Sequence, residues 1–329
     1  MKKTFLYFCL LFIVQTAFAA DSLYVREQQI PILIDRIDNV LYEMRIPAQK
    51  GDVLNEITIQ IGDNVDLSDI QAIRLFYSGV EAPSRKGEHF SPVTYISSHI
   101  PGNTRKALES YSVRQDEVSA PLSRTVKLTS KQPMLKGINY FWVSIQMKPE
   151  TSLLAKVATT MPNAQINNKP IDITWKGKVD ERHVGIGVRQ AGDDGSAAFR
   201  IPGLVTTNNG TLLGVYDIRY NSSVDLQEKI DIGVSRSTDK GQTWEPMRVA
   251  MTFKQTDGLP HGQNGVGDPS ILVDEKTNTI WVVAAWTHGM GNERAWWNSM
   301  PGMTPDETAQ LMLVKSEDDG KTLSLIHIS

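Results

Sequence analysis

The sequence has little of several features that mark large classes of protein. Its 329 residues contain one cysteine, Cys9, so a disulfide framework is excluded. The formal net charge of -3 is too small to indicate a nucleic acid or an anionic membrane as partner. The six histidines are scattered without metal-ligand spacing, and no long helical pattern or low-complexity tract is present. These absences leave an ordinary globular chain, long enough for two domains.

A basic, then apolar, segment begins the chain. Two lysines precede an almost unbroken apolar run, which ends in a small-x-small cleavage pattern at Ala17-Phe18-Ala19. The run is too short to span a bilayer. The pattern therefore predicts a secretory signal at residues 1–20, with export to the periplasm or the extracellular space. After cleavage we expect no integral membrane segment and no cysteine.

From residue 21 to about residue 180, short strand-like segments alternate with polar linkers. Ile57 and Ile59 are separated by a polar residue, as in a half-buried strand. Strands at this spacing are typical of a β-sandwich. Trp142 and Trp175 could stack on sugar rings, but tryptophan is commoner in cores, so we expect packing roles for both.

Beyond residue 181, hairpins recur. Strand-like runs flank an Asn-Gly turn at residues 208–210 and a second turn at residues 276–278. The motif Ser-x-Asp-x-Gly-x-Thr-Trp at residues 237–244 returns at residues 316–323 with leucine in place of tryptophan. Its aspartate can accept backbone N–H bonds across a turn, and its glycine permits a positive φ. Its tryptophan is expected to pack between neighbouring sheets. We interpret the motif residues as structural: Ser237, Asp239, Gly241, Trp244, Ser316, Asp318 and Gly320.

The repeat predicts a β-propeller after the sandwich. At ~40–50 residues per blade, the two motifs would lie about two blades apart. Residues 181–329 would then hold about three blades. The expected fold class is all-β, with a β-sandwich followed by a partial propeller.

The second half of the chain contains Phe199-Arg200-Ile201-Pro202, Tyr216-Asp217-Ile218-Arg219, Gly267-Asp268-Pro269-Ser270 and the two copies of the Ser-x-Asp-x-Gly-x-Thr-Trp motif, known as aspartate boxes. With these motifs, residues 183–322 resemble the first part of the catalytic domain of bacterial exo-α-sialidases (neuraminidases). The aspartate box alone also occurs in other propellers, but the ordered combination of motifs is specific. The segment before it is similar to an accessory β-sandwich found in some sialidases. The resemblance implies a six-bladed propeller.

The resemblance implies roles for four residues. Sialic acid carries a carboxylate on its anomeric carbon, which a guanidinium can hold with two charge-assisted hydrogen bonds. Arg200 matches the first of three such arginines, and Asp217 matches the acid that protonates the leaving oxygen. Arg219, on the same strand face as Asp217, would touch the sugar or steady the acid. Asp268 would line the sugar pocket, or alternatively stabilise a turn.

Other aromatic residues receive packing interpretations. Tyr216 and Tyr220 would point to the opposite strand face from Asp217. Trp286-Thr287-His288, together with Trp296-Trp297, could form an aromatic wall, although packing within the blades explains them equally well.

The reaction implied is hydrolysis of terminal α-linked sialic acid with retention. The substrates would be sialylated glycans on glycoproteins, gangliosides or oligosaccharides, with no metal, organic cofactor or nucleic acid. In the family, the nucleophilic tyrosine, its glutamate and two more arginines follow the second aspartate box. Because the motif departs at Leu323, our hypothesis is an interrupted chain, inactive by itself. The alternatives are a carbohydrate-binding protein without catalysis and another aspartate-box propeller glycosidase.

Overall fold

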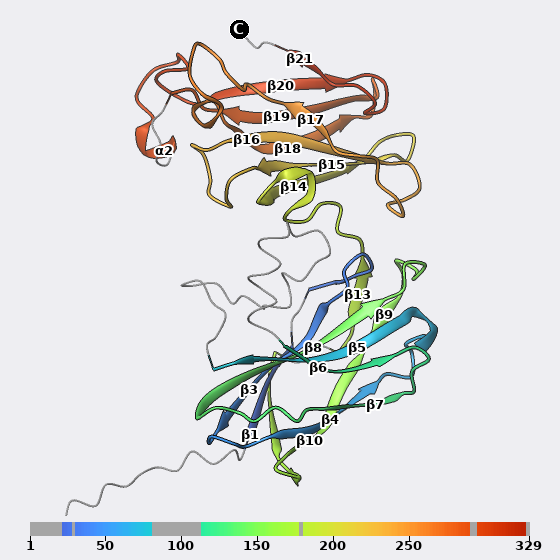
Figure 1. The fold of residues 1–329 in the computed structure, drawn as a ribbon. Helices are drawn as coiled ribbons and strands as arrows, with labels where there is room; N and C mark the ends of the chain where they lie inside the picture. The colour runs from blue at the N-terminus through green and yellow to red at the C-terminus, as the bar shows by residue number, and fades with distance from the viewer. Residues whose placement is uncertain (1–21, 28–29, 81–112, 178–179, 290–294, 327–329) are drawn as a thin grey trace, which may run out of the picture.

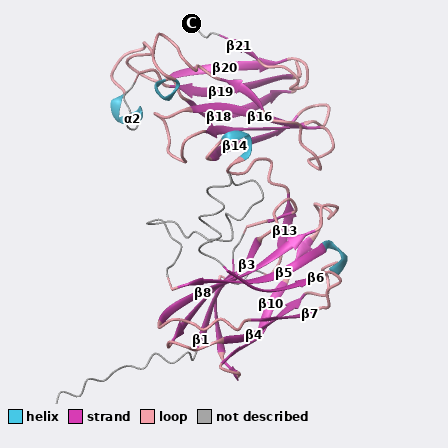
Figure 2. Cartoon of the chain, viewed as in Figure 1, coloured by secondary structure: helices cyan, strands magenta, loops and turns pink. Residues whose placement is uncertain are grey.

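The computed structural model describes residues 22–27, 30–80, 113–177, 180–289 and 295–326. Figures 1 and 2 show two lobes built mainly of strands, the first ending near residue 185 and the second beginning near residue 198. Helical structure in the described residues is limited to α2 (Ala295–Asn298) and short 3-10 turns. The all-β prediction is confirmed. The predicted signal at residues 1–20 lies outside the described residues.

The first lobe is a sandwich of two sheets. Buried apolar side chains from both sheets form one core, with Leu23 and Phe141 on one side and Ile57 and Ile59 on the other. The larger sheet has the order β12 (Asp172–Lys176), β1 (Ser22–Glu27), β3 (Asn39–Ala48), β8 (Gly137–Met147), β5 (Ile70–Gly79) and β6 (Val113–Ser119). The smaller has the order β11 (Lys169–Pro170), β10 (Thr159–Ile166), β4 (Leu54–Ile61) and β7 (Thr125–Thr129).

Both tryptophans of the sandwich have packing roles, as the sequence predicts. Trp142 is 1% exposed and donates from its indole nitrogen to Ser78 Oγ at 2.7 Å. Trp175 packs against the core and meets the ring of Tyr42 edge-on, with 5.5 Å between the ring centroids. Trp142 therefore offers no open face for stacking on a sugar, and Trp175 is partly buried against the core.

A small three-stranded sheet completes the first lobe. It has the order β2 (Ile32–Leu33), β13 (Arg182–Gly185) and β9 (Lys156–Val157). Val184 of β13 is 5% exposed and belongs to the sandwich core. β13 follows the division predicted at residue 180, yet its hydrogen bonds are to strands of the first lobe.

The second lobe consists, in the described residues, of two four-stranded antiparallel sheets. In each, strands adjacent in the chain are adjacent in the sheet, as in a propeller blade. The first contains β14 (Ala198–Thr206), β15 (Leu212–Arg219), β16 (Ile230–Ser237) and β17 (Arg248–Met251). The second contains β18 (Val266–Asp274), β19 (Thr279–Trp286), β20 (Gln310–Ser316) and β21 (Ser324–Ile326). Both predicted hairpins are present, and one apolar core containing Val215 and Val282 joins the sheets.

Each aspartate box forms the turn after the third strand of its sheet. Ser237 Oγ donates to Asp239 Oδ1 at 2.8 Å and accepts from the Gly241 N–H at 2.9 Å. Asp239 also accepts from the backbone and hydroxyl of Thr243, and Gly241 has a φ of 85°. The second box repeats these bonds. The geometry agrees with a structural role for the motif.

Two details of the propeller prediction are wrong. The boxes lie in consecutive sheets, so their separation is one blade rather than two, and residues 181–329 show two sheets rather than three in their described part. Long connections, such as residues 287–309 between β19 and β20, lengthen each blade. Trp244 lies against Gly214 of its own sheet, with its nearest ring carbon 3.7 Å from where a Cβ would stand.

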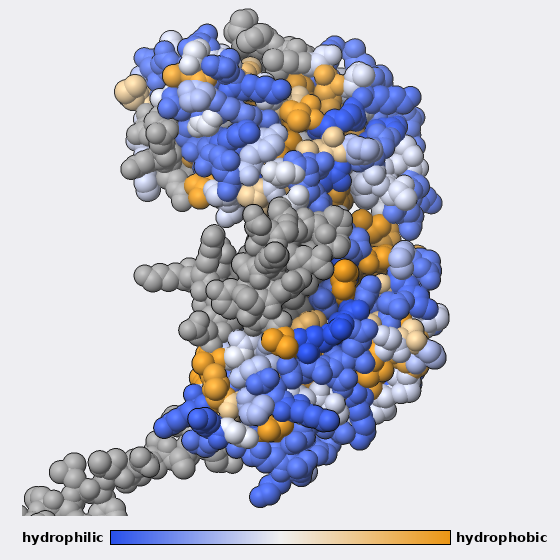
Figure 3. Space-filling model, viewed as in Figure 1, coloured by the Kyte–Doolittle hydropathy of each residue, from blue (hydrophilic) through white to orange (hydrophobic). Residues whose placement is uncertain are grey.

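The surface in Figure 3 is mostly hydrophilic, with apolar residues in small separated groups. Within the described residues, the search for helices of membrane-spanning length and hydropathy finds none.

Candidate active site

The ladder between β14 and β15 brings the two arginine motifs together. Arg200 pairs directly with Asp217 across the two strands. Side chains of directly paired residues lie on the same face of a sheet, and so do residues two apart on one strand. Arg200, Asp217 and Arg219 therefore share one face of the first sheet, as the sequence predicts for the latter two.

Asp217 and Arg219 form a buried ion pair. The Arg219 Nε and Nη2 atoms donate to Asp217 Oδ2 at 3.0 and 2.7 Å, and each side chain is only 1% exposed. Burial raises the pKa of Asp217 to about 6, although hydrogen bonds and charge from Arg219 oppose this shift. A carboxyl with this pKa holds a proton in mildly acidic solution and can release it to a substrate.

A second carboxylate, Asp225, lies between the two arginines. Its Oδ1 atom accepts from Arg219 Nη1 at 2.6 Å and from Arg200 Nη1 at 2.9 Å. The Ser223 carbonyl oxygen accepts from the same two nitrogens at 2.9 and 3.0 Å. All three guanidinium nitrogens of Arg219 are thus directed at protein acceptors, which favours the steadying role over contact with a sugar.

Asp268 approaches Asp217 from the second sheet. Its backbone N–H donates to Asp217 Oδ1 at 2.9 Å, while its side chain is exposed. Among the described residues, its carboxylate has no hydrogen-bond partner. The turn is therefore not stabilised by this side chain, and the carboxylate remains open at the edge of the site.

Two unusual backbone positions flank the site. Ile201 has a φ of 53° and Asp268 a φ of 57°, and each precedes a proline within an irregularity of its strand ladder. A positive φ is strained for a β-branched residue, and strain of this kind clusters at functional sites. The sequence shows the Ile-Pro and Asp-Pro pairs, but their strand-like surroundings conceal the reversal of φ.

The remaining aromatic residues behave as packing groups. The Tyr216 hydroxyl bonds Ser235 Oγ at 2.6 Å, and the Tyr220 hydroxyl donates to Asp231 Oδ2 at 3.0 Å. Trp286 is 8% exposed and stacks on Phe253 with 4.6 Å between ring centroids. These positions confirm the packing interpretation of Tyr216 and Tyr220. Trp297 is 68% exposed, and the side chain of Trp296 lies outside the description.

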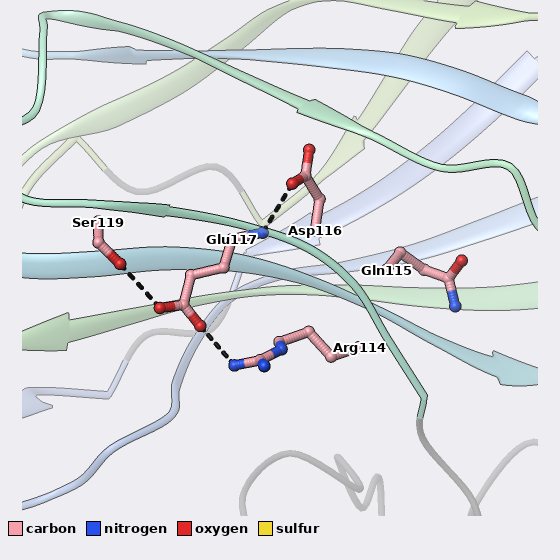
Figure 4. A pocket seen from close by; sticks show the side chains of 5 residues that line it. All are labelled: Arg114, Gln115, Asp116, Glu117 and Ser119. Atoms are coloured by element: carbon pink, nitrogen blue, oxygen red, sulfur yellow. Dashed lines mark hydrogen bonds and ion pairs between the residues drawn. The ribbon is translucent and has the colours of Figure 1, made fainter.

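A polar hollow of about 450 Å³ lies beside β6 in the sandwich, away from this site. Figure 4 shows that Glu117, in its centre, accepts bonds from Ser119 and Arg114. The neighbouring Asp116 accepts from the backbone and hydroxyl of Thr129. Because these carboxylates are already paired within the protein, they indicate no ligand. Within the described ranges, no group of three or more His, Cys, Asp or Glu side chains is placed to hold a metal ion.

The sequence reasoning missed Asp225 and the residues that anchor it. Asp225 lies in an irregular loop between β15 and β16, where hydrophobic periodicity carries no information. One signal was available: two arginines on the same face of neighbouring strands require an acidic partner if either is buried. Only the structure identifies which acid supplies it.

Comparison with known proteins relates both lobes to one family. Residues 20–170 match the family model described as the N-terminal domain of BNR-repeat neuraminidase. A sialidase from Bacteroides fragilis (strain YCH46) is 56% identical over 98% of this chain and 60% of its own length. A sialidase from Paraclostridium sordellii is 36% identical over 38% of this chain and 28% of its own.

A solved structure is similar over both lobes. Hadza microbial sialidase Hz136 is 60% identical, with a TM-score of 0.76, over 92% of this chain and 58% of that one. The chain thus spans about 60% of the length of the relatives that match it along nearly its whole sequence.

Proposed function

Because the chain belongs to the sialidase (neuraminidase) family, we propose that it is part of an exo-α-sialidase. The reaction proposed is the hydrolysis of terminal α-linked sialic acid from glycans, with retention at the anomeric carbon. The substrates proposed are sialylated glycoproteins, gangliosides and oligosaccharides. Export through the N-terminal signal belongs to the same proposal, since such substrates are met outside the cytoplasm.

One observation carries the proposal: the environment of Asp217. A glycosidase needs a carboxylic acid that stays protonated near neutral pH beside the leaving oxygen. Asp217 is buried, its pKa is raised to about 6, and a cationic side chain lies opposite it in the strand ladder. A proton donor next to a carboxylate-binding guanidinium suits a sugar that is itself a carboxylic acid.

The roles proposed for the other residues follow from their positions. Arg200, with its side chain 43% exposed, would bind the substrate carboxylate. Arg219 would steady Asp217 rather than reach the sugar, since its nitrogens already bond to the protein. Asp268, exposed at the edge, would accept a hydrogen bond from a sugar hydroxyl or N-acyl group.

The test measures release of free sialic acid from α-sialyllactose by the purified whole protein to which this chain belongs. Asp217→Ala removes the proton donor and should lower kcat/KM by about 10²- to 10⁴-fold. Asp306→Ala removes a carboxylate that is 83% exposed in the same lobe, and should leave the rate unchanged.

Equal activity of the two variants would contradict the role of Asp217. Binding of the trisaccharide without any release by the unaltered protein would instead favour the carbohydrate-binding alternative. Cleavage of other glycosides, without need of Arg200, would favour another propeller glycosidase.

A further inference from the structure

We propose that Asp225 is a positioning residue for this site, which fixes both Arg200 and Arg219 and acts on Asp217 through Arg219. The expected effect of Asp225 on catalysis rests on the proposed function. Its structural basis is independent of that function, because it depends only on contacts among residues of this chain.

The geometry makes Asp225 the junction of the site. One oxygen, Oδ1, receives Nη1 of both arginines at 2.6 and 2.9 Å. Two guanidinium groups that meet at one point would repel each other, and the carboxylate between them offsets that repulsion. The result is a continuous chain of charge-assisted bonds from Asp217 through Arg219 and Asp225 to Arg200.

The loop that carries Asp225 is anchored immediately after it. The Leu226 carbonyl accepts from the Ala295 N–H at 3.0 Å, and the Leu226 side chain is 8% exposed. Gln227 Nε2 donates to the Thr287 carbonyl at 3.0 Å, and the Thr287 hydroxyl donates back to Gln227 Oε1. These bonds tie the loop to the connection after β19, so Asp225 is held from outside the first sheet.

For Arg200, this contact determines which edge of the guanidinium is open. Nη1 is directed at Asp225 and the Ser223 carbonyl. Among the described residues, Nε and Nη2 have no hydrogen-bond partner. The Nε–Nη2 edge can therefore receive a carboxylate in the bidentate geometry that arginine favours. Without Asp225, the half-exposed side chain would sample other orientations, which costs binding energy.

For Asp217, the contact determines how much positive charge it receives. The charged groups that face Asp217 are Arg219 on its own strand, Arg200 opposite on β14 and Asp268 from β18. Asp225 competes with Asp217 for the charge of Arg219. Without Asp225, the positive charge of Arg219 acts on Asp217 alone. It then stabilises the carboxylate form of Asp217 more strongly and lowers the pKa of Asp217.

The experiment compares Asp225→Ala with Glu228→Ala in the full-length protein. Glu228 lies in the same loop and bonds to Asn221 and its neighbour's N–H, not to either arginine. Two quantities are measured: KM for an aryl α-sialoside, and the pKa of the Asp217 carboxyl by ¹³C NMR, assigned with Asp217→Asn. The NMR titration requires no activity.

We expect Asp225→Ala to raise KM about tenfold, the effect of losing a hydrogen bond between charged groups. The pKa of Asp217 should fall by about one unit, as expected for removal of a nearby like charge. Asp225→Asn keeps a hydrogen-bond acceptor but not the charge. Its KM should therefore lie between those of the unaltered protein and Asp225→Ala, while its Asp217 pKa should be as low as in Asp225→Ala. It also serves if the alanine variant does not fold.

The proposal would be overturned if Asp225→Ala had the same KM and the same Asp217 pKa as Glu228→Ala. If the unaltered protein cleaves no sialoside, the proposed function fails. The NMR titration then decides the positioning role alone: a lowered Asp217 pKa supports it, and an unchanged pKa rejects it.

Discussion

At the scale of the residue, Asp217 is governed by two opposed effects. Burial disfavours its charged form, whereas the bidentate contact with Arg219 favours it. Burial is the larger, so the pKa rises to about 6 instead of falling as it does for an exposed ion pair. Asp217 is then half protonated near pH 6, and the contact with Arg219 keeps its pKa from rising further.

This balance predicts the pH dependence of the reaction. A general acid acts in its protonated form, so kcat/KM should be lost as pH rises through about 6. The measurement is the pH profile of kcat/KM for an aryl α-sialoside between pH 4 and 9. An activity that stays constant up to pH 8 would show that Asp217 is not the group that limits the rate.

The same shift affects stability with a definite sign. The pKa of Asp217 in the folded protein exceeds its ordinary value of 3.8, so the folded state binds more protons between these two pH values. The contribution of Asp217 to the free energy of unfolding therefore falls as pH rises across this interval. A thermal denaturation series separates this effect from catalysis, because Asp217→Asn should remove it.

How far the sequence predicts the site depends on the kind of residue. Asp217 and Arg219 lie two apart on a strand, so the period of two places them on one face. Arg200 joins them because a two-strand hairpin with an Asn-Gly turn sets the register. Asp225 lies in a connection without periodicity, where only the folded loop determines which side chain reaches the arginines.

At the scale of the element, the second aspartate box joins the two sheets of the propeller lobe. Asp319 accepts from the hydroxyls of Thr207 and Thr211, both at 2.6 Å, and from Arg236 Nη2 at 2.9 Å. These partners belong to the first sheet and its hairpin turn. Arg248 adds bonds to the carbonyls of the same box. The motif therefore stabilises the sheet interface as well as its own turn.

Removal of this contact should be costly. Asp319→Ala leaves Arg236, whose side chain is 9% exposed, without one of its two carboxylates. We expect the free energy of unfolding to fall by about 2–4 kcal/mol, since a partly buried charge loses its partner. Glu317→Ala, in the same turn but 66% exposed, should cost less than about 0.5 kcal/mol. Equal denaturant midpoints for the two variants would contradict the role of Asp319.

The strands were more predictable than the number of blades. Turn residues and alternation locate both hairpins, because these signals are local. The predicted blade count failed because it used an average repeat length. The connection of residues 252–265 adds length without a strand, and nothing in its composition indicates how many residues a blade contains.

At the scale of the whole molecule, the two lobes have separate hydrophobic cores. The sandwich core draws on residues from Leu23 to Val184, and the propeller core on residues from Leu213 to Val314. Each core is contiguous in sequence, so each lobe can bury its apolar surface without the other. The position of the division then decides whether the first lobe is complete.

The pairing of β13 with strands of the first lobe favours a division after Gly185, whereas the sequence predicts one at residue 180. Arg182 is 4% exposed, and its Nη1 atom donates to the Val40 carbonyl at 2.8 Å. Val184 fills part of the core, and β13 pairs with β2 and β9. A fragment that stops at residue 180 loses this strand, a buried apolar side chain and the donor to Val40.

We therefore expect the fragment of residues 21–185 to unfold cooperatively. The free energy of unfolding of the fragment of residues 21–180 should be lower by about 2–5 kcal/mol, because the truncation leaves a core cavity and an unpaired buried polar group. Urea denaturation of both fragments, followed by circular dichroism, measures the difference. Restoring residues 181–185 with Val184→Ala should recover only part of it, because the strand returns without its core contact. If all three fragments share one midpoint, β13 contributes nothing to the sandwich, and the division at residue 180 is the better description of the molecule.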